Sequence, residues 1–175
     1  MSDLYKKIVS ERSGLEKIIA KIPGFRGYKE MTARREADRL IREHVVRQLK
    51  DQMQALIGVE KKMISSGGLS LVSKVKSGKL AFQTFIDRVN TAAPGYSGFY
   101  DSIKVGSDEL EKIYAFDAAM VRYADQMREI VMSLEAAVGA KDNDKTELVI
   151  NALDSLASEA NAAFGMREDL LTGLA

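Results

Sequence analysis

The chain has 175 residues, of which 46% are hydrophobic, and its 26 basic and 25 acidic residues leave a formal net charge of +1. This length and hydrophobic content fit one domain with its own core. The balanced charge gives no overall attraction to nucleic acid or to a membrane surface. The absence of cysteine excludes disulfides, thiolate nucleophiles and thiolate metal sites. Without a signal-peptide pattern or a run of 18 apolar residues, we expect a soluble cytoplasmic protein.

Apolar residues recur at helical spacing along the whole sequence, and no sustained period-two pattern is present. Gly67 and Gly68 are typical of a helix end, Gly165 is expected to end the last helix, and Gly78 is a weak point inside the third. The spacing predicts five helices, near residues 3–22, 29–65, 69–92, 107–138 and 145–164. We therefore predict an all-α fold, an antiparallel helical bundle of about five helices. The expected domain covers 1–164, followed by a short amphipathic tail over 165–175.

Two segments of the sequence repeat each other and contain both prolines. The first runs from Leu15 to Tyr28, and the second, 71 positions later, from Ile86 to Phe99. Each reads as the last turns of a helix followed by Pro-Gly-aromatic-x-Gly-aromatic, a pattern that ends a helix and permits a tight reversal. We predict a duplicated helix–elbow–helix unit. Because helices joined by short connections are usually antiparallel neighbours, both elbows are expected at one end of the bundle.

This elbow end would gather aromatic and basic side chains into a candidate interaction surface. Aromatic and arginine side chains are enriched in the hot spots of protein interfaces. The same side chains could instead plug the open end of the core, and both interpretations stay open. The residues of the candidate surface are Phe25, Arg26, Tyr28, Lys29, Tyr96, Phe99 and Tyr100.

The second predicted helix is rich in arginine. At about 100° per residue, Arg35, Arg39 and Arg42 share one face, which is a candidate anion-contacting face because guanidinium groups match phosphate oxygens. The alternative, which we favour, is a solvated face with internal salt bridges. Asp38 stands four residues before Arg42, and Glu43 stands four before Arg47, both in the favourable order for an ion pair.

Asp117 occupies an apolar stripe of the fourth predicted helix. A lone buried carboxylate is costly, so we expect it to be paired. It lies roughly 18 Å along its helix from the elbow end, at about 1.5 Å per residue, and Arg39 and Arg42 lie at a similar depth on the second helix. The sequence therefore predicts a buried ion pair between Asp117 and one of these arginines, with a role in helix register. A catalytic role is much less favoured because no second acid or nucleophile converges on Asp117.

Motifs for catalysis, cofactors or metals are missing from the sequence. The one histidine, His44, is expected to be a half-buried packing residue, and one histidine cannot supply the two Glu-x-x-His motifs of a di-iron bundle. We therefore assign no catalytic, cofactor or metal residue. We favour a non-enzymatic structural or protein-interaction protein. The alternative is a module that binds an anionic ligand, nucleic acid or a membrane surface through the Arg-rich face and the aromatic elbow end.

Self-association is a further expectation from helix length. The second and fourth helices are predicted to be longer than the others, so the ends of their apolar stripes would need cover. The fifth helix and the tail would cover part of these ends and a dimer the remainder, and the alternative is a compact monomer in which helix and tail suffice. The residues expected to need cover are Leu56, Met63, Ile64, Leu134 and Val138.

Overall fold

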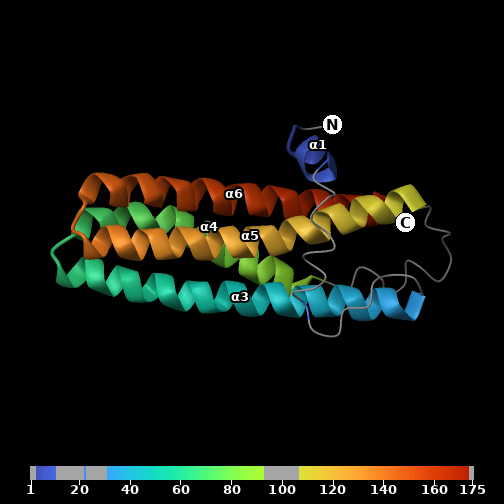
Figure 1. Cartoon of the computed structure of the whole chain (residues 1–175), viewed down its shortest axis with the longest axis horizontal. Helices are drawn as coiled ribbons and strands as arrows, with labels where there is room; N and C mark the ends of the chain where they lie inside the picture. The colour runs from blue at the N-terminus through green and yellow to red at the C-terminus, as the bar shows by residue number, and fades with distance from the viewer. Residues whose placement is uncertain (1–2, 11–21, 23–30, 93–106, 174–175) are drawn as a thin grey trace.

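The structure is a computed structural model, and it describes residues 3–10, 22, 31–92 and 107–173 (Figure 1). Over these ranges every regular element is a helix and no strand is present, which confirms the prediction of an all-helical fold. The helices pack against each other. Their bounds are α1 Asp3–Ser10, α3 Met31–Ser65, α4 Leu69–Thr91, α5 Ser107–Gly139 and α6 Asn143–Gly173. No helix in this part of the chain is long and apolar enough to cross a membrane.

The prediction that the last helix ends at Gly165 is wrong, because α6 continues to Gly173. The helical period of buried residues runs on past the glycine, with Phe164, Arg167 and Leu171 all buried. A glycine inside a helix costs only about 1 kcal/mol relative to alanine, which this further packing offsets. Residues 165–173 are therefore the last turns of α6. The division of the chain into a domain over 1–164 and a tail over 165–175 stays a prediction.

Two helical hairpins, α3–α4 and α5–α6, are closed by the same kind of three-residue turn. In the first turn the N–H groups of Gly68 and Gly67 donate to the carbonyls of Met63 (2.8 Å) and Ile64 (3.1 Å), with Gly67 at φ 83°. In the second, the N–H groups of Asp142 and Lys141 donate to Ala137 and Val138, both at 3.1 Å. This is the Schellman pattern of helix termination, in which one residue adopts a left-handed conformation.

Lys141 takes that left-handed conformation with φ 57°, although it carries a Cβ atom. Replacing Lys141 by glycine is expected to raise the free energy of unfolding by roughly 0.5–1 kcal/mol, because glycine has no Cβ to clash at positive φ. Urea denaturation followed by circular dichroism would measure the change. Lys141→Ala is the matched control, since it removes the side chain but keeps the Cβ atom. An equal gain from both variants would contradict the backbone explanation.

The two hairpins lie side by side in the same orientation. Within the first, Lys79 pairs with Glu60 near the turn while Arg42 reaches Ala92 far from it, so α3 and α4 run in opposite directions. Across the hairpins, Lys62 of α3 pairs with Glu135 of α5, towards the end of both helices.

The same parallel relation holds between α4 and α6. Lys74 pairs with Glu147 near the start of both helices, and Arg88 donates to the carbonyl of Asn161 further along both. The extensive helix contacts follow the order α3–α4–α6–α5 and back to α3. An antiparallel relation between all neighbouring helices is therefore not observed.

The residues expected to need cover at the ends of the second and fourth helices are mostly enclosed within one chain. Leu56, Met63 and Leu134 are buried, Val138 is half-buried, and only Ile64 of this group is exposed. Leu56 and Met63 belong to α3, which packs against α4 and α5, and Leu134 belongs to α5, which packs against α3 and α6. The argument from helix length therefore no longer supports self-association.

Gly78 lies where the backbones of two helices approach each other closely. A Cβ atom at this position would lie 3.0 Å from the backbone nitrogen of Asp154 and 3.1 Å from its Cα atom. Glycine therefore lets the backbones of α4 and α6 meet, which explains why a helix-disfavouring residue stands in the middle of α4.

Candidate functional site

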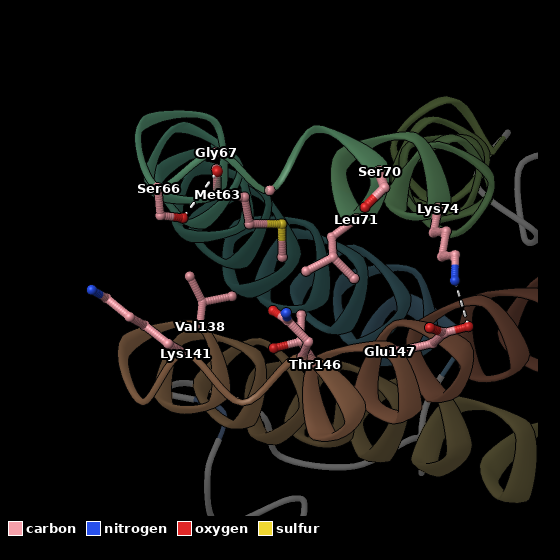
Figure 2. A pocket seen from close by; sticks show the side chains of 12 residues that line it. Met63, Ser66, Gly67, Ser70, Leu71, Lys74, Val138, Lys141, Thr146 and Glu147 are labelled. Atoms are coloured by element: carbon pink, nitrogen blue, oxygen red, sulfur yellow. Dashed lines mark hydrogen bonds and ion pairs between the residues drawn. The ribbon is translucent and has the colours of Figure 1, made fainter.

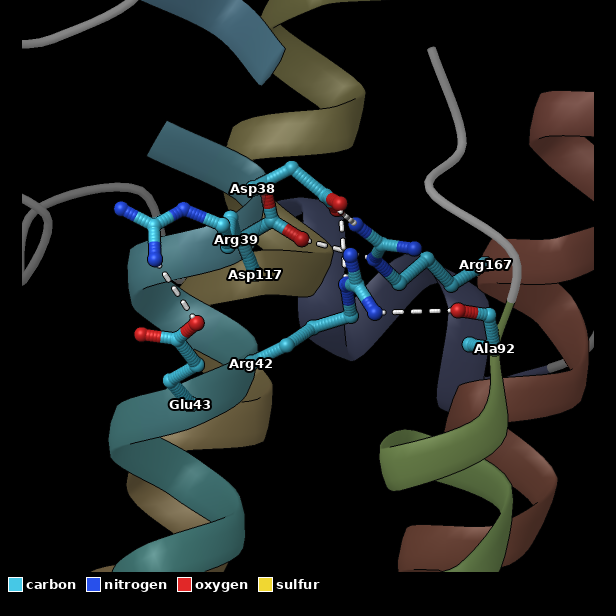
Figure 3. Close-up of polar contacts among 7 residues, drawn as sticks. All are labelled: Asp38, Arg39, Arg42, Glu43, Ala92, Asp117 and Arg167. Atoms are coloured by element: carbon cyan, nitrogen blue, oxygen red, sulfur yellow. Dashed lines mark hydrogen bonds and ion pairs between the residues drawn. The ribbon is translucent and has the colours of Figure 1, made fainter. Parts of the chain in front are cut away.

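Charged side chains from three helices meet in the interior of the bundle (Figure 3). The guanidinium of Arg167 on α6 donates from Nε to Oδ1 of Asp117 on α5, and from Nη2 to Oδ1 of Asp38 on α3, both at 2.7 Å. The three side chains are almost completely enclosed, with exposed fractions of 4%, 2% and 0%. Buried ion pairs of this kind are retained only where hydrogen bonds compensate for lost hydration.

Arg42 extends this buried charge cluster to the fourth helix of the bundle. Its Nε donates to Oδ2 of Asp38 at 2.9 Å, and its Nη1 donates to the carbonyl of Ala92 at 2.9 Å. Ala92 is the C-cap of α4. The cluster of Asp38, Arg42, Asp117 and Arg167 contains two carboxylates and two guanidinium groups, so its formal charges cancel while its hydrogen bonds link α3, α4, α5 and α6.

The described contacts of Asp117 involve another arginine than the two predicted from the sequence. Its described ion pair is with Arg167, while Arg42 pairs with Asp38 and Arg39 pairs with Glu43 at 2.9 Å. Depth along a helix was the only basis for selecting Arg39 or Arg42. The direction around the helix axis decides the contact: Arg42 points to the end of α4, and Arg39 is 52% exposed.

The Arg-rich face of the second predicted helix divides between these contacts. The predicted Asp38–Arg42 pair is present at 2.9 Å, whereas Glu43 binds Arg39 in place of the predicted Arg47. Thus two of the three proposed anion-contacting arginines already bind carboxylates. The side chain of the third, Arg35, lies outside the described residues, as do all seven residues of the candidate interaction surface.

Sequence reasoning missed Arg167 as a member of the cluster. A signal was available, because Arg167 stands three residues after Phe164 and four before Leu171, inside an apolar stripe. Asp117 was selected on this same criterion. Arg167 was not, because the last helix was expected to end at Gly165. Asp38 was considered only as the partner of Arg42, and its burial was not predicted.

The surface of the described part of the chain includes two hollows formed by helix ends and turns. One, of about 460 Å³, lies between the two hairpin turns (Figure 2). Gly67 and Lys141 line it from the two turns, and the Lys74–Glu147 ion pair crosses it at 2.6 Å. The other, of about 510 Å³, lies between α3 and the end of α4. Its lining holds the charged residues Arg39, Arg42, Glu43, Arg47, Lys50 and Asp51 above an apolar floor of Val46 and Val89.

The hydrogen bonds of the buried cluster link α3, α4, α5 and α6, as a structural role requires. Neither hollow is lined by Asp38, Asp117 or Arg167, so a molecule in either would not reach these carboxylates. His44 is buried in α3 and lines neither hollow. Among the described residues no group of three or more histidine, cysteine, aspartate or glutamate side chains is arranged to hold a metal ion.

Comparison with known proteins finds no family, no curated protein and no solved structure that matches this chain.

Proposed function

We propose that the protein is a non-enzymatic helical interaction protein whose bundle presents the two Pro-Gly elbows to a partner protein. The supporting observation is the placement of the helix ends that flank the elbows. The first residue of α3, the end of α4 and the first residue of α5 all lie away from the two hairpin turns (Figure 1). One attachment of the first elbow segment and both attachments of the second therefore lie away from the hairpin turns.

The buried charge cluster supports the same interpretation. Arg42 holds the carbonyl of Ala92, two residues before Pro94, and Arg167 joins α6 to both α3 and α5. These bonds join α3, at which the first elbow segment ends, to α4 and α5, between which the second segment lies. An interaction surface formed by connecting segments loses conformational entropy when these segments become ordered on binding. Rigid helices at the ends of the segments reduce this loss.

A duplicated unit is part of this proposal. The elbow segments repeat at a distance of 71 residues in the sequence. In the structure Gly67 and Lys141, the left-handed residues of the two turns, are 74 positions apart, and the Lys62–Glu135 and Lys74–Glu147 pairs each join residues 73 apart. These spacings support two related hairpins packed in one orientation, each preceded by an elbow.

The alternative of an anion-binding module receives less support. Arg39 and Arg42 bind Glu43 and Asp38, so the charge of both is already compensated. The hollow beside them has acidic as well as basic residues in its lining. We therefore do not propose binding of nucleic acid or of a membrane surface.

Site-specific photo-crosslinking tests the interaction function. A benzophenone amino acid replaces Tyr28 or Tyr96, and the cells that make the protein are irradiated. Discrete adducts heavier than the chain are expected, because aromatic side chains at interfaces pack closely against the partner. Met132 and Leu148, which are exposed on α5 and α6, are the matched control positions. Identical adducts at all four positions, or none at the elbows, would refute the proposal. Crosslinks formed within the chain leave its mass unchanged. At the elbow positions they would instead support the interpretation that these aromatic side chains close the open end of the core.

A further inference from the structure

The large apolar side chains that are exposed in the described part of the chain fall into two groups, one on each hairpin. Ile64, Leu69 and Leu80 belong to the α3–α4 hairpin, and Met132 and Leu148 belong to the α5–α6 hairpin. Four of the five have exposed fractions between 61% and 70%. Single exposed apolar residues are ordinary on a protein surface, whereas apolar residues grouped within a polar rim are typical of an interaction site. The surroundings of each group therefore decide its meaning.

The first group includes residues on the outer face of the α3–α4 hairpin. On α4, Gly78 meets the backbone of α6, and Lys79 pairs with Glu60 of α3. At about 100° per residue, Leu80 points away from both of these neighbouring helices. Leu69, eleven residues earlier, has nearly the same direction because eleven residues complete three turns.

The charge around the first group is positive. The stretch 61–86 contains five lysines and no acidic residue. Three of the lysines pair with glutamates of other helices, whereas Lys61 and Lys76 are exposed and form no ion pair with a described residue. Lys76 stands one helical turn before Leu80, so the two side chains share a face. Two copies of such a face would repel each other, so it fits an acidic surface.

The second group lies on the outer face of the α5–α6 hairpin, where negative charge is in excess. The stretch 125–155 contains seven acidic and three basic residues. Glu129 stands three residues before Met132, and Asp144 stands four before Leu148, so each acid shares a face with its apolar neighbour. Both acids are exposed and form no ion pair with a described residue.

The basic face and the acidic face lie on opposite sides of the bundle, because α3 and α4 form one side and α5 and α6 form the other (Figure 1). Helix α1 contacts the α5–α6 side at Phe116 and Glu159. These contacts are well away from the hairpin turns, near which Met132 and Leu148 lie. Helix α1 therefore leaves this part of the acidic face open.

The contact between the two hairpins of one chain has the same distribution of charge. In three ion pairs between them the base belongs to α3 or α4 and the acid to α5 or α6. These pairs are Lys62–Glu135, Lys74–Glu147 and Arg88–Glu168. The buried pair of Arg167 with Asp38 has the opposite order. Near the surface, then, a basic hairpin already binds an acidic hairpin that lies beside it in the same orientation.

We propose that copies of this chain associate side by side, with the basic outer face of α3–α4 in one copy against the acidic outer face of α5–α6 in the next. The apolar groups of the two faces pack together, and lysines of one face meet acids of the other. Because the two faces differ, the contact is heterologous and leaves one face of each kind free at the ends. The faces are small, so the association belongs to the weak and transient class.

Sedimentation equilibrium of the full chain tests the association. At protein concentrations up to about 1 mM, where weak contacts become populated, the average mass is expected to rise above 19.3 kDa without levelling at twice this value. Sodium chloride at about 0.5 M in place of about 0.05 M should weaken the association roughly tenfold, because it screens the charges of both faces. A mass that stays at 19.3 kDa at every concentration would overturn the proposal.

Two variants, Leu80→Gln and Met132→Gln, remove one face each and serve as controls for each other. Glutamine adds no charge and keeps a good helix propensity. Each variant alone should self-associate at least about tenfold more weakly than the wild-type chain, because an apolar side chain no longer becomes buried. An equimolar mixture should form a one-to-one complex with the affinity of the wild-type contact, since each variant supplies the face that the other lacks. This complex should not grow further.

The mixture distinguishes the possible geometries. Association weakened by one variant and unchanged by the other would mean that two like faces meet, which contradicts the proposal. Association unchanged by both variants would place the contact on another surface, with the same conclusion. A benzophenone at Met132 or Leu148 should give an adduct of twice the chain mass, which differs from the adducts of a partner protein at Tyr28 or Tyr96. The two proposals can therefore fail separately.

Discussion

Replacement of Arg167 by methionine is expected to lower the free energy of unfolding by about 3–5 kcal/mol. The guanidinium supplies hydrogen bonds at 2.7 Å to both Asp117 and Asp38, and all three side chains are buried. Its removal leaves the charge of Asp117 without this compensation in an environment from which water is excluded. Methionine fills most of the vacated volume. The decrease in the free energy of unfolding is therefore due mainly to the buried carboxylate that has lost its partner. Urea denaturation followed by circular dichroism at 222 nm measures it.

Arg39 provides the matched control for this substitution. It also forms an arginine–carboxylate pair, at 2.9 Å to Glu43, but both side chains are more than half exposed. Exposed pairs contribute about 0–1 kcal/mol, so Arg39→Met should change stability little. A loss from Arg167→Met no larger than that from Arg39→Met would contradict the role assigned to the buried cluster.

A double variant separates the stranded charge from the value of the ion pair itself. Asp117→Leu combined with Arg167→Met removes both charges of one pair and leaves the Asp38–Arg42 pair in place. Replacing a buried pair by apolar residues of similar volume is often neutral or stabilising. The double variant should therefore be more stable than Arg167→Met alone. A double variant that loses the sum of the two single effects would show that the charges do not interact.

Gly78→Ala is expected to lower the free energy of unfolding by about 1–3 kcal/mol, in the range of overpacked cores. Alanine has the better helix propensity, by about 1 kcal/mol, and this gain opposes the loss. The added Cβ atom would meet the backbone of Asp154 at 3.0 Å and the side chain of Leu153 at 3.2 Å. Backbone atoms of a packed helix cannot turn aside as a flexible side chain does, so α4 and α6 must separate.

Gly58→Ala is the control, and its expected sign is opposite. Gly58 lies inside α3, and a Cβ atom there would meet no atom within 4 Å beyond the helix's own backbone. The substitution should raise stability by about 0.5–1 kcal/mol through helix propensity alone. The same change of residue in two helices thus gives opposite results because of packing. A gain from Gly78→Ala equal to that from Gly58→Ala would show that the close helix approach is not required.

Local signals in the sequence predicted the helices well where a specific residue marks the end. Gly67 and Gly68 terminate α3 as expected, and α5 begins at the predicted Ser107. The burial of Asp117 was predictable because a single charged residue interrupted an apolar stripe. In each case the decisive interaction lies within a few residues along the chain or along one face of a helix.

The contacts between helices were less predictable, because they depend on rotation about each helix axis and on which helices become neighbours. Arg167 and Asp38 are 129 positions apart, and no local pattern relates them. The role of Gly78 likewise depends on the backbone of α6, which a reading of α4 alone does not include. A glycine that disfavours a helix and a glycine that permits helix contact look the same in the sequence.

The position of Arg167 near the carboxyl end has a consequence for the order in which the chain folds. The ribosome adds 129 residues after Asp38 to reach Arg167. Translation of this stretch takes about 6 to 26 s at roughly 5–20 residues per second. Over that interval the α3–α4 hairpin can close through local contacts, but the apolar side that later meets α5 and α6 remains open to other molecules. A growing chain therefore has its greatest need of a chaperone between the completion of α4 and the emergence of the last turns of α6.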